Sequence, residues 1–568
     1  MVIIMKNVLL YNVTTMDDMP GNASVPLAYV LLEEYLRFNN IGVLRYDYLW
    51  DSPKSSPYDF YYEYDLAGFQ LTYSNAEVIL KMLRKWVELD NKPIIVFGGV
   101  LASAIAIQLI ERYHFIDVVV IAEGEDALLQ LAQKKPYEII PGIVYRDDSG
   151  KITYNKGQKP IPFDNTSIPK QNFLLSMSKT EVQKVSIRIQ TARGCLGGCS
   201  FCNNSYKNRL DRVTTKVWRG MSPERVVREI DYLYTTYGVK IINFVDPSFE
   251  DPGKKGKNRI EKIANLLIEK DLKISFKVNM RAETFTDSAD DLRLLKLLKK
   301  AGMDIIILGI EACTDEELKI FGKNSNVEKN TKAYFRLKQM NSFFVNVGYI
   351  TIHPYSTIES LYRSYGYINK LGESFSFNIF LAALIPLRGT NIYDRMHEDN
   401  LITNHDDILQ IPKYKFINPK IALLCDAIQS MKIKYPIFLQ LNNTVWEALN
   451  VKARATNRVF EGMLNNEKVN LAFNKFSSFI NDEIFYTLGE KNYTIQKRML
   501  ELLETNWSEK KFDELFNESY IQYLVLTKKR IENEIFNLLT LINSEGYDIS
   551  ILQLKPWGAY CQYRTKLV

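Results

Sequence analysis

Two stretches of the chain alternate short apolar runs with helical patterns, and this alternation limits the possible folds more than any other feature. Asn7–Val13 and Pro93–Gly99 are nearly unbroken apolar runs, and Val25–Asn39 and Ala102–Tyr113 have helical spacing. Strands that are apolar on both faces are typical of a parallel sheet covered by helices. The sequence therefore predicts a doubly wound, Rossmann-like α/β domain over residues 1–140, with its ligand beyond the carboxyl ends of the strands.

The alternation starts again after residues 141–185, a polar stretch that we interpret as a short ribbon and a linker. Six strands are expected, from Ser186–Gln190 to Phe377–Leu384, with helices between them. This pattern predicts a partial (β/α)6, TIM-like barrel over residues 186–395, with its chemistry at the carboxyl ends of the strands. Residues 396–568 contain long amphipathic segments, so we expect a mostly helical C-terminal domain that caps the barrel and shapes the substrate pocket.

Composition narrows the class of protein further. The 568 residues exceed one ordinary core, and 46% hydrophobic with 24% charged residues is typical of globular domains. The net charge is only +6, and the densest basic run, Lys254–Arg259, lies in a predicted loop, so no nucleic-acid partner is expected. No apolar stretch reaches the roughly 18 residues of a membrane span, and no signal peptide is recognisable. We therefore expect a cytoplasmic protein with no membrane span.

Three of the six cysteines form the strongest local signal. Cys195, Cys199 and Cys202 have the spacing C-x3-C-x2-C and directly follow an expected strand. Each iron of a four-iron cluster needs a thiolate or a substitute ligand. Three cysteines on one loop can bind three irons and leave the fourth open to another ligand, and glycines such as Gly197 give the loop its backbone freedom.

A zinc site is the alternative interpretation of the same cysteines. Zinc motifs usually pair two short hooks to reach four ligands. The chain has no second pair of cysteines, and its four histidines, His114, His353, His397 and His405, lie far away in sequence. An iron–sulfur cluster is therefore favoured over zinc.

The cysteine motif, with the aromatic Phe201 before its last cysteine, resembles the radical S-adenosylmethionine (SAM) superfamily over residues 186 to about 390. The resemblance implies a [4Fe-4S] cluster whose open iron chelates SAM. It also implies an external low-potential electron donor of the flavodoxin or ferredoxin type. Reductive cleavage of SAM would then give a 5′-deoxyadenosyl radical, which the protein must keep in a dry, well-defined place.

The resemblance also implies that side chains at the ends of the barrel strands bind SAM. Phe201 is expected to contact the adenine, and Glu311 can accept hydrogen bonds from ribose hydroxyls. The segment Gly348–Pro354 resembles the Gly-x-Ile-x-Gly segment of the family, with His353 in place of the second glycine. Each acidic position could instead be an ordinary helix cap. The expected SAM-binding residues are Phe201, Asp246, Asn279, Arg281, Glu311 and His353.

Residues 1 to about 135 resemble the cobalamin-binding domain of the same superfamily branch. Gly98 and Gly99 end a strand and let the backbone approach a bulky ligand. The motif Asp-x-His-x-x-Gly, whose histidine would bind cobalt from below, is absent, so we expect no histidine on that face. The expected cobalamin-binding residues are Leu27, Thr72, Ser74, Gly98, Gly99, Ser103, Glu123, Gly124 and Glu125. The alternative is a flavodoxin-like domain that binds nothing.

Together, the resemblances imply an enzyme that uses SAM, a [4Fe-4S] cluster and cobalamin. The reaction most typical of this set is methylation of a carbon or phosphorus atom, here on a peptide or small-molecule substrate. Cyclisation, ring contraction or another rearrangement is the first alternative. A corrinoid-binding sensor or carrier with a structural cluster and a radical enzyme without cobalamin are the others. Cys561 could reach back to the site, although an ordinary buried cysteine is the simpler interpretation.

Overall fold

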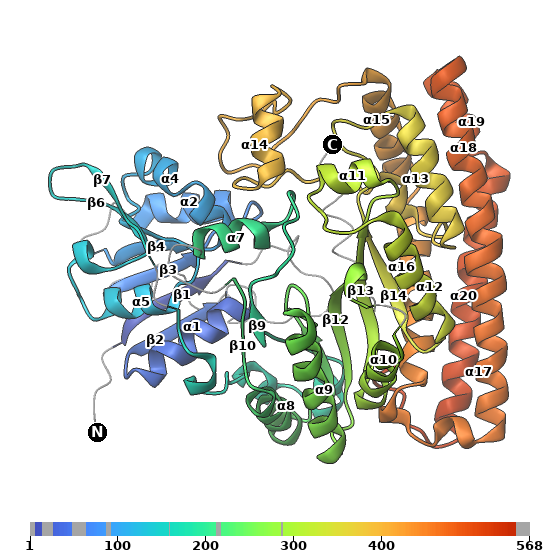
Figure 1. The fold of residues 1–568 in the computed structure, drawn as a ribbon, viewed down its shortest axis with the longest axis horizontal. Helices are drawn as coiled ribbons and strands as arrows, with labels where there is room; N and C mark the ends of the chain where they lie inside the picture. Colours follow the sequence, from blue (N-terminus) through green and yellow to red (C-terminus); the bar gives the residue numbers. More distant parts are fainter. Residues whose placement is uncertain are drawn as a thin grey trace.

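The computed structural model describes residues 6–13, 26–47, 64–86, 92–157, 160–211, 217–285 and 288–552, so Cys561 lies outside the described residues. Two sheets follow one another along the chain, and a layer of long helices covers the far side of the second sheet (Figure 1). None of the helices in the described ranges is both long and apolar enough to cross a membrane.

The N-terminal sheet begins with five parallel strands in the order β2-β1-β3-β4-β5. Its central strands are buried on both faces, because Leu9 and Tyr11 of β1 pack into one core while Val8 and Leu10 pack into another. The strands are β1 (Lys6–Asn12), β2 (Gly42–Asp47), β3 (Leu66–Gln70), β4 (Ile94–Gly98) and β5 (Val118–Val120). The helices are α1 (Leu27–Phe38), α2 (Ala76–Trp86), α3 (Val100–Ala104), α4 (Ala106–Arg112) and α5 (Glu125–Ala132). This is the doubly wound arrangement that the alternation predicts.

Two further strands extend this sheet into residues 141–185, which we expected to be a ribbon and a linker. β6 (Ile143–Arg146) pairs antiparallel with β5, and β7 (Ile152–Asn155) pairs antiparallel with β6. The ribbon joins the sheet because Ile143, Val144 and Tyr145 are buried and cover the edge of β5. The sheet therefore has seven strands and ends at Asn155.

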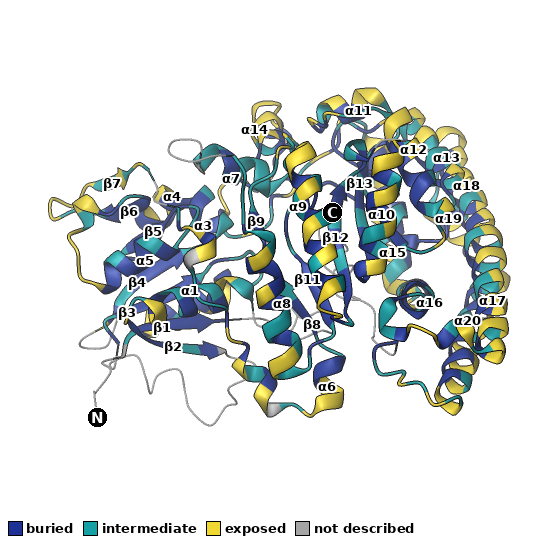
Figure 2. Ribbon diagram, turned by 60° about the horizontal axis from the view of Figure 1, so that its bottom comes forward, coloured by how far each residue is buried: buried dark blue, intermediate teal, exposed yellow. Residues whose placement is uncertain are grey.

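The second sheet has five parallel strands in the order β14-β13-β12-β11-β8. They are β8 (Ser186–Ile189), β11 (Ile241–Phe244), β12 (Ser275–Arg281), β13 (Met303–Glu311) and β14 (Phe344–Tyr349). The connecting helices include α8 (Pro223–Tyr237), α9 (Gly253–Glu269), α10 (Ala289–Ala301), α11 (Asp315–Ile320), α12 (Val327–Gln339) and α13 (Ile358–Lys370). Figure 2 shows exposed residues on the outward sides of α8 and α9. This is the expected partial barrel.

Two local predictions in the barrel are wrong. The basic run Lys254–Arg259 lies in α9 and not in a loop, because the helix begins directly after Pro252. The expected strand Phe377–Leu384 is mostly a 3-10 helix, and only a parallel bridge from Ile352 to Ala383 marks the sixth strand position. Its phenylalanines are spaced for a helical turn: Phe377 and Phe380 are buried, and Phe377 packs on Phe438 with ring centroids 4.4 Å apart.

The C-terminal region is mostly helical and shares one hydrophobic core with the barrel. Its elements are α14 (Asn391–Glu398), α15 (Pro419–Lys434), α16 (Ile437–Ala455), α17 (Glu467–Phe479), the π-helix η11 (Ile480–Leu488), α18 (Gly489–Thr505), α19 (Glu509–Glu514) and α20 (Glu518–Ser544). α16 packs against β13, β14 and α20. Asn457, just after α16, donates to Gly302 O at 2.8 Å, which places this end of the helical layer at the amino end of β13.

Candidate active site

The three cysteines lie on the loop between the short strand β9 (Ala192–Arg193) and α7 (Asn203–Asp211). All three are partly buried and none forms a disulfide. The backbone N–H of Gly197 donates to Cys195 Sγ at 3.3 Å. A Cβ atom at position 197 would lie 3.3 Å from Cys195 Sγ and 3.7 Å from Cys199 Sγ. The loop therefore brings two of the thiols to either side of a residue that has no side chain.

Burial disfavours the thiolate forms of two of the cysteines. Burial raises the pKa of Cys195 to about 12, and the Asp251 carboxylate adds to this effect; burial raises the pKa of Cys199 to about 12 as well. Such thiols stay protonated unless a metal compensates the thiolate charge. Within the described ranges, no three His, Cys, Asp or Glu side chains converge on one metal ion. A cubane does not need such convergence, because its cysteines bind different irons.

The cysteine loop is anchored to the segment that follows α11. Ser200 N and Ser200 Oγ donate to Phe321 O and Ile320 O, each at 2.8 Å. Gly322 has a φ of +62°, and a Cβ atom there would lie only 2.8 Å from Gly198 O. Phe201 packs edge-on against Phe321 with ring centroids 5.7 Å apart. These contacts fix the loop over the carboxyl end of the barrel.

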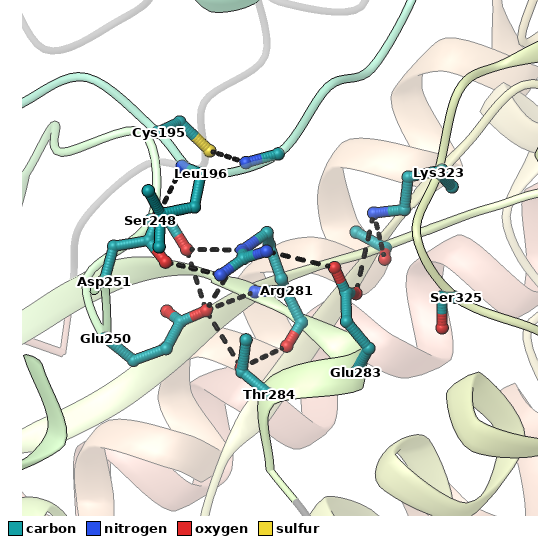
Figure 3. A network of polar contacts seen from close by, with 12 residues as sticks. Cys195, Leu196, Ser248, Glu250, Asp251, Arg281, Glu283, Thr284, Lys323 and Ser325 are labelled. Carbon is teal, nitrogen blue, oxygen red and sulfur yellow. Dashed lines mark hydrogen bonds and ion pairs between the residues drawn. The ribbon is translucent and has the colours of Figure 1, made fainter. Parts of the chain in front are cut away.

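A network of charged side chains lies beside the cysteine loop (Figure 3). Arg281, at the end of β12, pairs with Asp251 and lies 3.3 Å from Glu283 Oε1. Asp251 also accepts a hydrogen bond from the N–H of Leu196 at 2.9 Å. Glu250 accepts from Arg281 N at 3.1 Å, and both Glu250 and Asp251 are fully buried. The network therefore connects the β11–α9 loop directly to the residue after Cys195.

Lys323 extends this charged region toward the end of β13. Its ammonium donates to Gly309 O at 3.1 Å and lies 4.0 Å from carboxylate oxygens of both Glu283 and Glu311. The side chain is almost fully buried, and the two carboxylates outweigh burial and raise its pKa. The carboxyl end of the barrel thus presents both positive and negative groups near Cys199.

The remaining predicted SAM-binding residues make internal contacts. Asp246 is fully buried and accepts hydrogen bonds from the N–H groups of Thr191 and Ala192 at 2.7 and 2.9 Å. Asn279 donates to Asp246 O at 2.9 Å. His353 is only 1% exposed, and its Nε2 lies 3.4 Å from Glu317 Oε1. Asp246 and Asn279 therefore shape the entry to the cysteine loop, and Arg281 and Glu311 belong to the charged region.

A cavity of about 310 Å³ separates the carboxyl end of the N-terminal sheet from the cysteine loop and α7. Seven of the predicted cobalamin-binding residues line it: Leu27, Gly98, Gly99, Ser103, Glu123, Gly124 and Glu125. Thr72 and Ser74 do not line it. The hydroxyls of Thr72 and Ser74 are 2.8 Å apart, and Thr72 Oγ1 accepts from Asn75 N in the turn before α2. No histidine occurs among the described residues of the cavity wall.

The opposite wall of this cavity comes from residues that were not among those predicted to bind cobalamin. Arg193 and Gly194 line it, together with Asn204, Tyr206, Lys207, Asn208 and Leu210 of α7. Tyr206 Oη donates to Ser103 O at 3.0 Å, which ties α7 to the N-terminal domain. The position of α7 directly after the motif is the one signal that could have pointed to these residues.

Two arginines join the domains at the rim of the cavity. Arg193 pairs with Glu125 and, at 2.8 Å, with Glu123, which also pairs with Arg219. Burial raises the pKa of Glu125, but Arg193 and Arg219 together hold it below its ordinary value. Both predicted glutamates are therefore engaged in ion pairs, and Arg193 lies two residues before Cys195.

Comparison with known proteins agrees with this arrangement. Residues 189–368 match the Radical SAM superfamily, so the chain contains a radical SAM domain. An uncharacterised methyltransferase of Pyrococcus horikoshii is 26% identical over 374 residues, which are 63% of this chain and 74% of that protein. The anaerobic magnesium-protoporphyrin IX monomethyl ester cyclase of Cereibacter sphaeroides is 29% identical over 48% of this chain and 43% of its own length. The 4′-phospho-dehydrooxetanocin synthase of Priestia megaterium is 24% identical over 65% and 50%.

Solved structures resemble the chain beyond the radical SAM domain. The cobalamin-dependent SAM radical enzyme OxsB, solved with aqua-cobalamin and SAM, matches 99% of this chain and 83% of its own with a TM-score of 0.67 and 17% identity. The radical SAM methyltransferase TsrM of Kitasatospora setae, solved with cobalamin and a [4Fe-4S] cluster, matches 69% and 75% with a TM-score of 0.51 and 16% identity. The predicted α/β fold is confirmed, and it is shared with OxsB over nearly the whole chain.

Proposed function

We propose that the chain is a cobalamin-dependent radical SAM enzyme that binds a [4Fe-4S] cluster on Cys195, Cys199 and Cys202. The observation that carries this proposal is that the cavity and the cysteine loop share part of one wall. Gly194 lines the cavity of the N-terminal domain and directly precedes Cys195. A ligand in that cavity would therefore lie next to the loop of the cluster, as a two-cofactor reaction requires.

The N-terminal side of the cavity has open space beside its glycine backbone. A Cβ atom at Gly98 would have no atom within 4 Å, so the backbone there faces open space. Gly99 has a φ of +99°, which favours glycine and turns the chain into α3. The surrounding wall is largely apolar and includes Leu27, Val96 and Val120. We propose that cobalamin lies here, with no histidine on cobalt from the N-terminal side.

The charged region fits the polar groups of SAM. SAM carries a carboxylate, an ammonium, a sulfonium and two ribose hydroxyls. Arg281 and Lys323 can donate to the carboxylate, and Glu283 and Glu311 can accept from the ammonium and the hydroxyls. The pairing of Arg281 with the buried Asp251 restricts the orientation of its guanidinium before SAM binds.

The protein contributes position and exclusion of water more than chemistry. When bound, the cluster supplies the electron that cleaves SAM and cobalamin supplies a carrier for the methyl group. Arg193 and Tyr206 join the segment around the cysteines to the N-terminal domain, and this fixes the separation of the two sites. The expected low-potential electron donor and the cytoplasmic location remain predictions.

The reaction that we propose is methyl transfer to a carbon or phosphorus atom of a peptide or small-molecule substrate. A methyltransferase of P. horikoshii among the relatives supports it. Cyclisation or another rearrangement is the second candidate, because other relatives are a cyclase and a synthase.

The test is to incubate the anaerobically reconstituted protein with SAM and a low-potential reductant and to quantify 5′-deoxyadenosine and S-adenosylhomocysteine. We expect both products, with Cys199→Ala as the inactive control. Deoxyadenosine without S-adenosylhomocysteine, in the presence of hydroxocobalamin, would favour the rearrangement. The absence of both products would contradict radical SAM chemistry and favour a sensor or carrier.

A further inference from the structure

A second cavity, of about 300 Å³, lies at the opposite end of the barrel from the cysteine loop. It borders Phe344 and Val345, the first residues of β14, whereas the cysteine loop lies beyond the carboxyl ends of the strands. Its other walls come from the end of α12, from α16 and from the π-helix η11. This site is therefore separate from the candidate active site.

Two lysines line this cavity, and their charges are unequally balanced. The Lys338 ammonium lies 3.5 Å from Glu373 Oε1 and 3.8 Å from the ring centroid of Phe485. Lys452 Nζ has only the amide oxygen of Asn481 nearby, at 3.5 Å, and no carboxylate in the described ranges lies within ion-pair distance of it. The cavity wall therefore carries one cation more than its single carboxylate can balance.

Partial burial and the closeness of the two lysines disfavour the charged form of Lys452. Burial and the neighbouring Lys338 lower the pKa of Lys452 to about 8, which means that the two ammonium groups repel each other across the cavity. Burial also raises the pKa of Glu373, whose carboxylate accepts from the hydroxyl of Tyr334. Lys452 is partly buried, so its charge is incompletely solvated and has no acidic partner in the described ranges. A ligand of opposite charge beside it would compensate for the lost solvation.

The remaining wall combines aromatic surfaces with amide groups. Phe343, Phe344, Phe375 and Leu449 supply apolar surface, and Asn341 and Asn481 supply amides. Asn481 and Phe485 project from the π-helix Ile480–Leu488. π-Helical turns are rare and are frequent at functional sites, because they re-aim side chains out of the regular helical register.

We propose that this cavity binds a small organic anion, with its carboxylate or phosphate between Lys338 and Lys452 and its apolar body against Phe343, Phe344 and Phe375. Among the described residues, the cavity shares no wall residue with the cysteine loop, and its ligand would bind at the end of the barrel opposite the proposed cofactors.

The test is isothermal titration calorimetry of the reconstituted protein with phenyl phosphate, benzoate and inorganic phosphate. We expect phenyl phosphate or benzoate to bind, and the probe that binds more tightly identifies the preferred anionic group. Inorganic phosphate should bind about tenfold more weakly than that probe. Equal affinity for inorganic phosphate would show that the aromatic walls take no part and would overturn the assignment to an organic anion. No binding by any of the three would overturn the site itself.

Two variants locate the binding. Lys452→Gln removes the cation that has no acidic partner in the described part of the chain. It is expected to lower the affinity for the tighter-binding probe by about tenfold or more. Asn481→Asp, at an exposed position of the π-helix, adds a carboxylate to the wall without touching the core and should weaken it similarly. Lys528→Gln removes the partner of Glu532 on α20, outside the cavity, and should change nothing. Unchanged affinity in both cavity variants would contradict the proposal.

Discussion

The parallel strands of the two sheets end in the same space but present different residues to it. In the N-terminal sheet, β4 ends at Gly98, which has apolar neighbours, and this edge forms one side of the 310 Å³ cavity. In the barrel, Arg281 and Glu311 end β12 and β13, and Asp251 lies in the loop after β11; these three belong to a connected set of charges that are buried or partly buried. In both sheets, the ligand is expected beyond the carboxyl ends of the parallel strands.

The difference shows how similar topology can take different ligands. A glycine-lined, apolar edge holds a large ligand by shape and brings the backbone close to it. A charged edge holds a small polar ligand and orients its groups by ion pairs. What a sheet of this kind binds is therefore decided by the loops after its strands and not by the order of the strands.

We expect the largest effect from removing one cysteine of the loop beside the charged region. Cys199→Ala should lose the cluster and reduce 5′-deoxyadenosine formation to background, because no other described thiol can replace this ligand on the loop. Iron analysis, electron paramagnetic resonance and product quantification check it. Cys313→Ala removes a cysteine that lies against Ser364, outside the loop, and is the control. A full cubane in Cys199→Ala would refute the ligand assignment.

We expect the next largest effect from filling the cavity at Gly98, which leaves the cysteine loop unchanged. Gly98→Leu places a side chain in open space, so it should occupy the cavity without straining the fold and reduce bound cobalt by about tenfold. Gly98→Ala is the matched control, because its single methyl group meets no atom within 4 Å. Iron content should stay at the wild-type level in both variants. Wild-type cobalt content in Gly98→Leu would mean that cobalamin does not lie against this strand.

A smaller effect concerns the ion pairs that hold the two sides together. Arg193→Gln leaves Glu125 buried without its cation, which typically costs about 3 kcal/mol of folding free energy. Thermal unfolding of the apo-protein measures the loss. Arg530→Gln, which breaks an exposed pair with Glu483, should cost roughly 0.5 kcal/mol and is the control. Equal losses in the two variants would show that the rim contacts do not join the domains.

The smallest effect is a dependence on pH at the same rim. Because the pKa of Glu125 in the folded protein lies below its ordinary value of 4.5, the pair stabilises the protein above that value. The stabilisation is lost as the pH falls through the lowered pKa. The difference in melting temperature between wild type and Glu125→Gln should therefore be full at pH 7 and should narrow below about pH 4.5. A difference that grows on acidification would reverse the sign of this interaction.

Some of the architecture could be predicted because it depends on local patterns. The alternation of apolar runs and helical spacing gave the two parallel sheets, and the spacing of three cysteines gave the loop. The prediction of a strand at Phe377–Leu384 was wrong. A short apolar run fits a helical turn as well as a strand when its aromatic residues are three apart. The tertiary contact of Phe377 with Phe438 decides between them.

Among the side chains of the candidate site, too, only those with a distinctive local pattern could be predicted from the sequence. Gly98 and Gly99 could be predicted because a glycine pair at a strand end has few other uses. Thr72 could not be separated from the wall residues, because capping a turn needs the same hydroxyl as binding a ligand. Glu250 and Lys323 were missed because distant loops bring them together, and sequence spacing carries no record of that contact.

The most direct test of the two-cofactor proposal is to measure iron, sulfide and cobalt per chain after anaerobic reconstitution with iron, sulfide and hydroxocobalamin. We expect about four irons and one cobalt per chain, with the ultraviolet–visible features of both cofactors. A complete cubane without cobalt would contradict it, because the glycine-lined cavity would then be a scaffold and not a cofactor site.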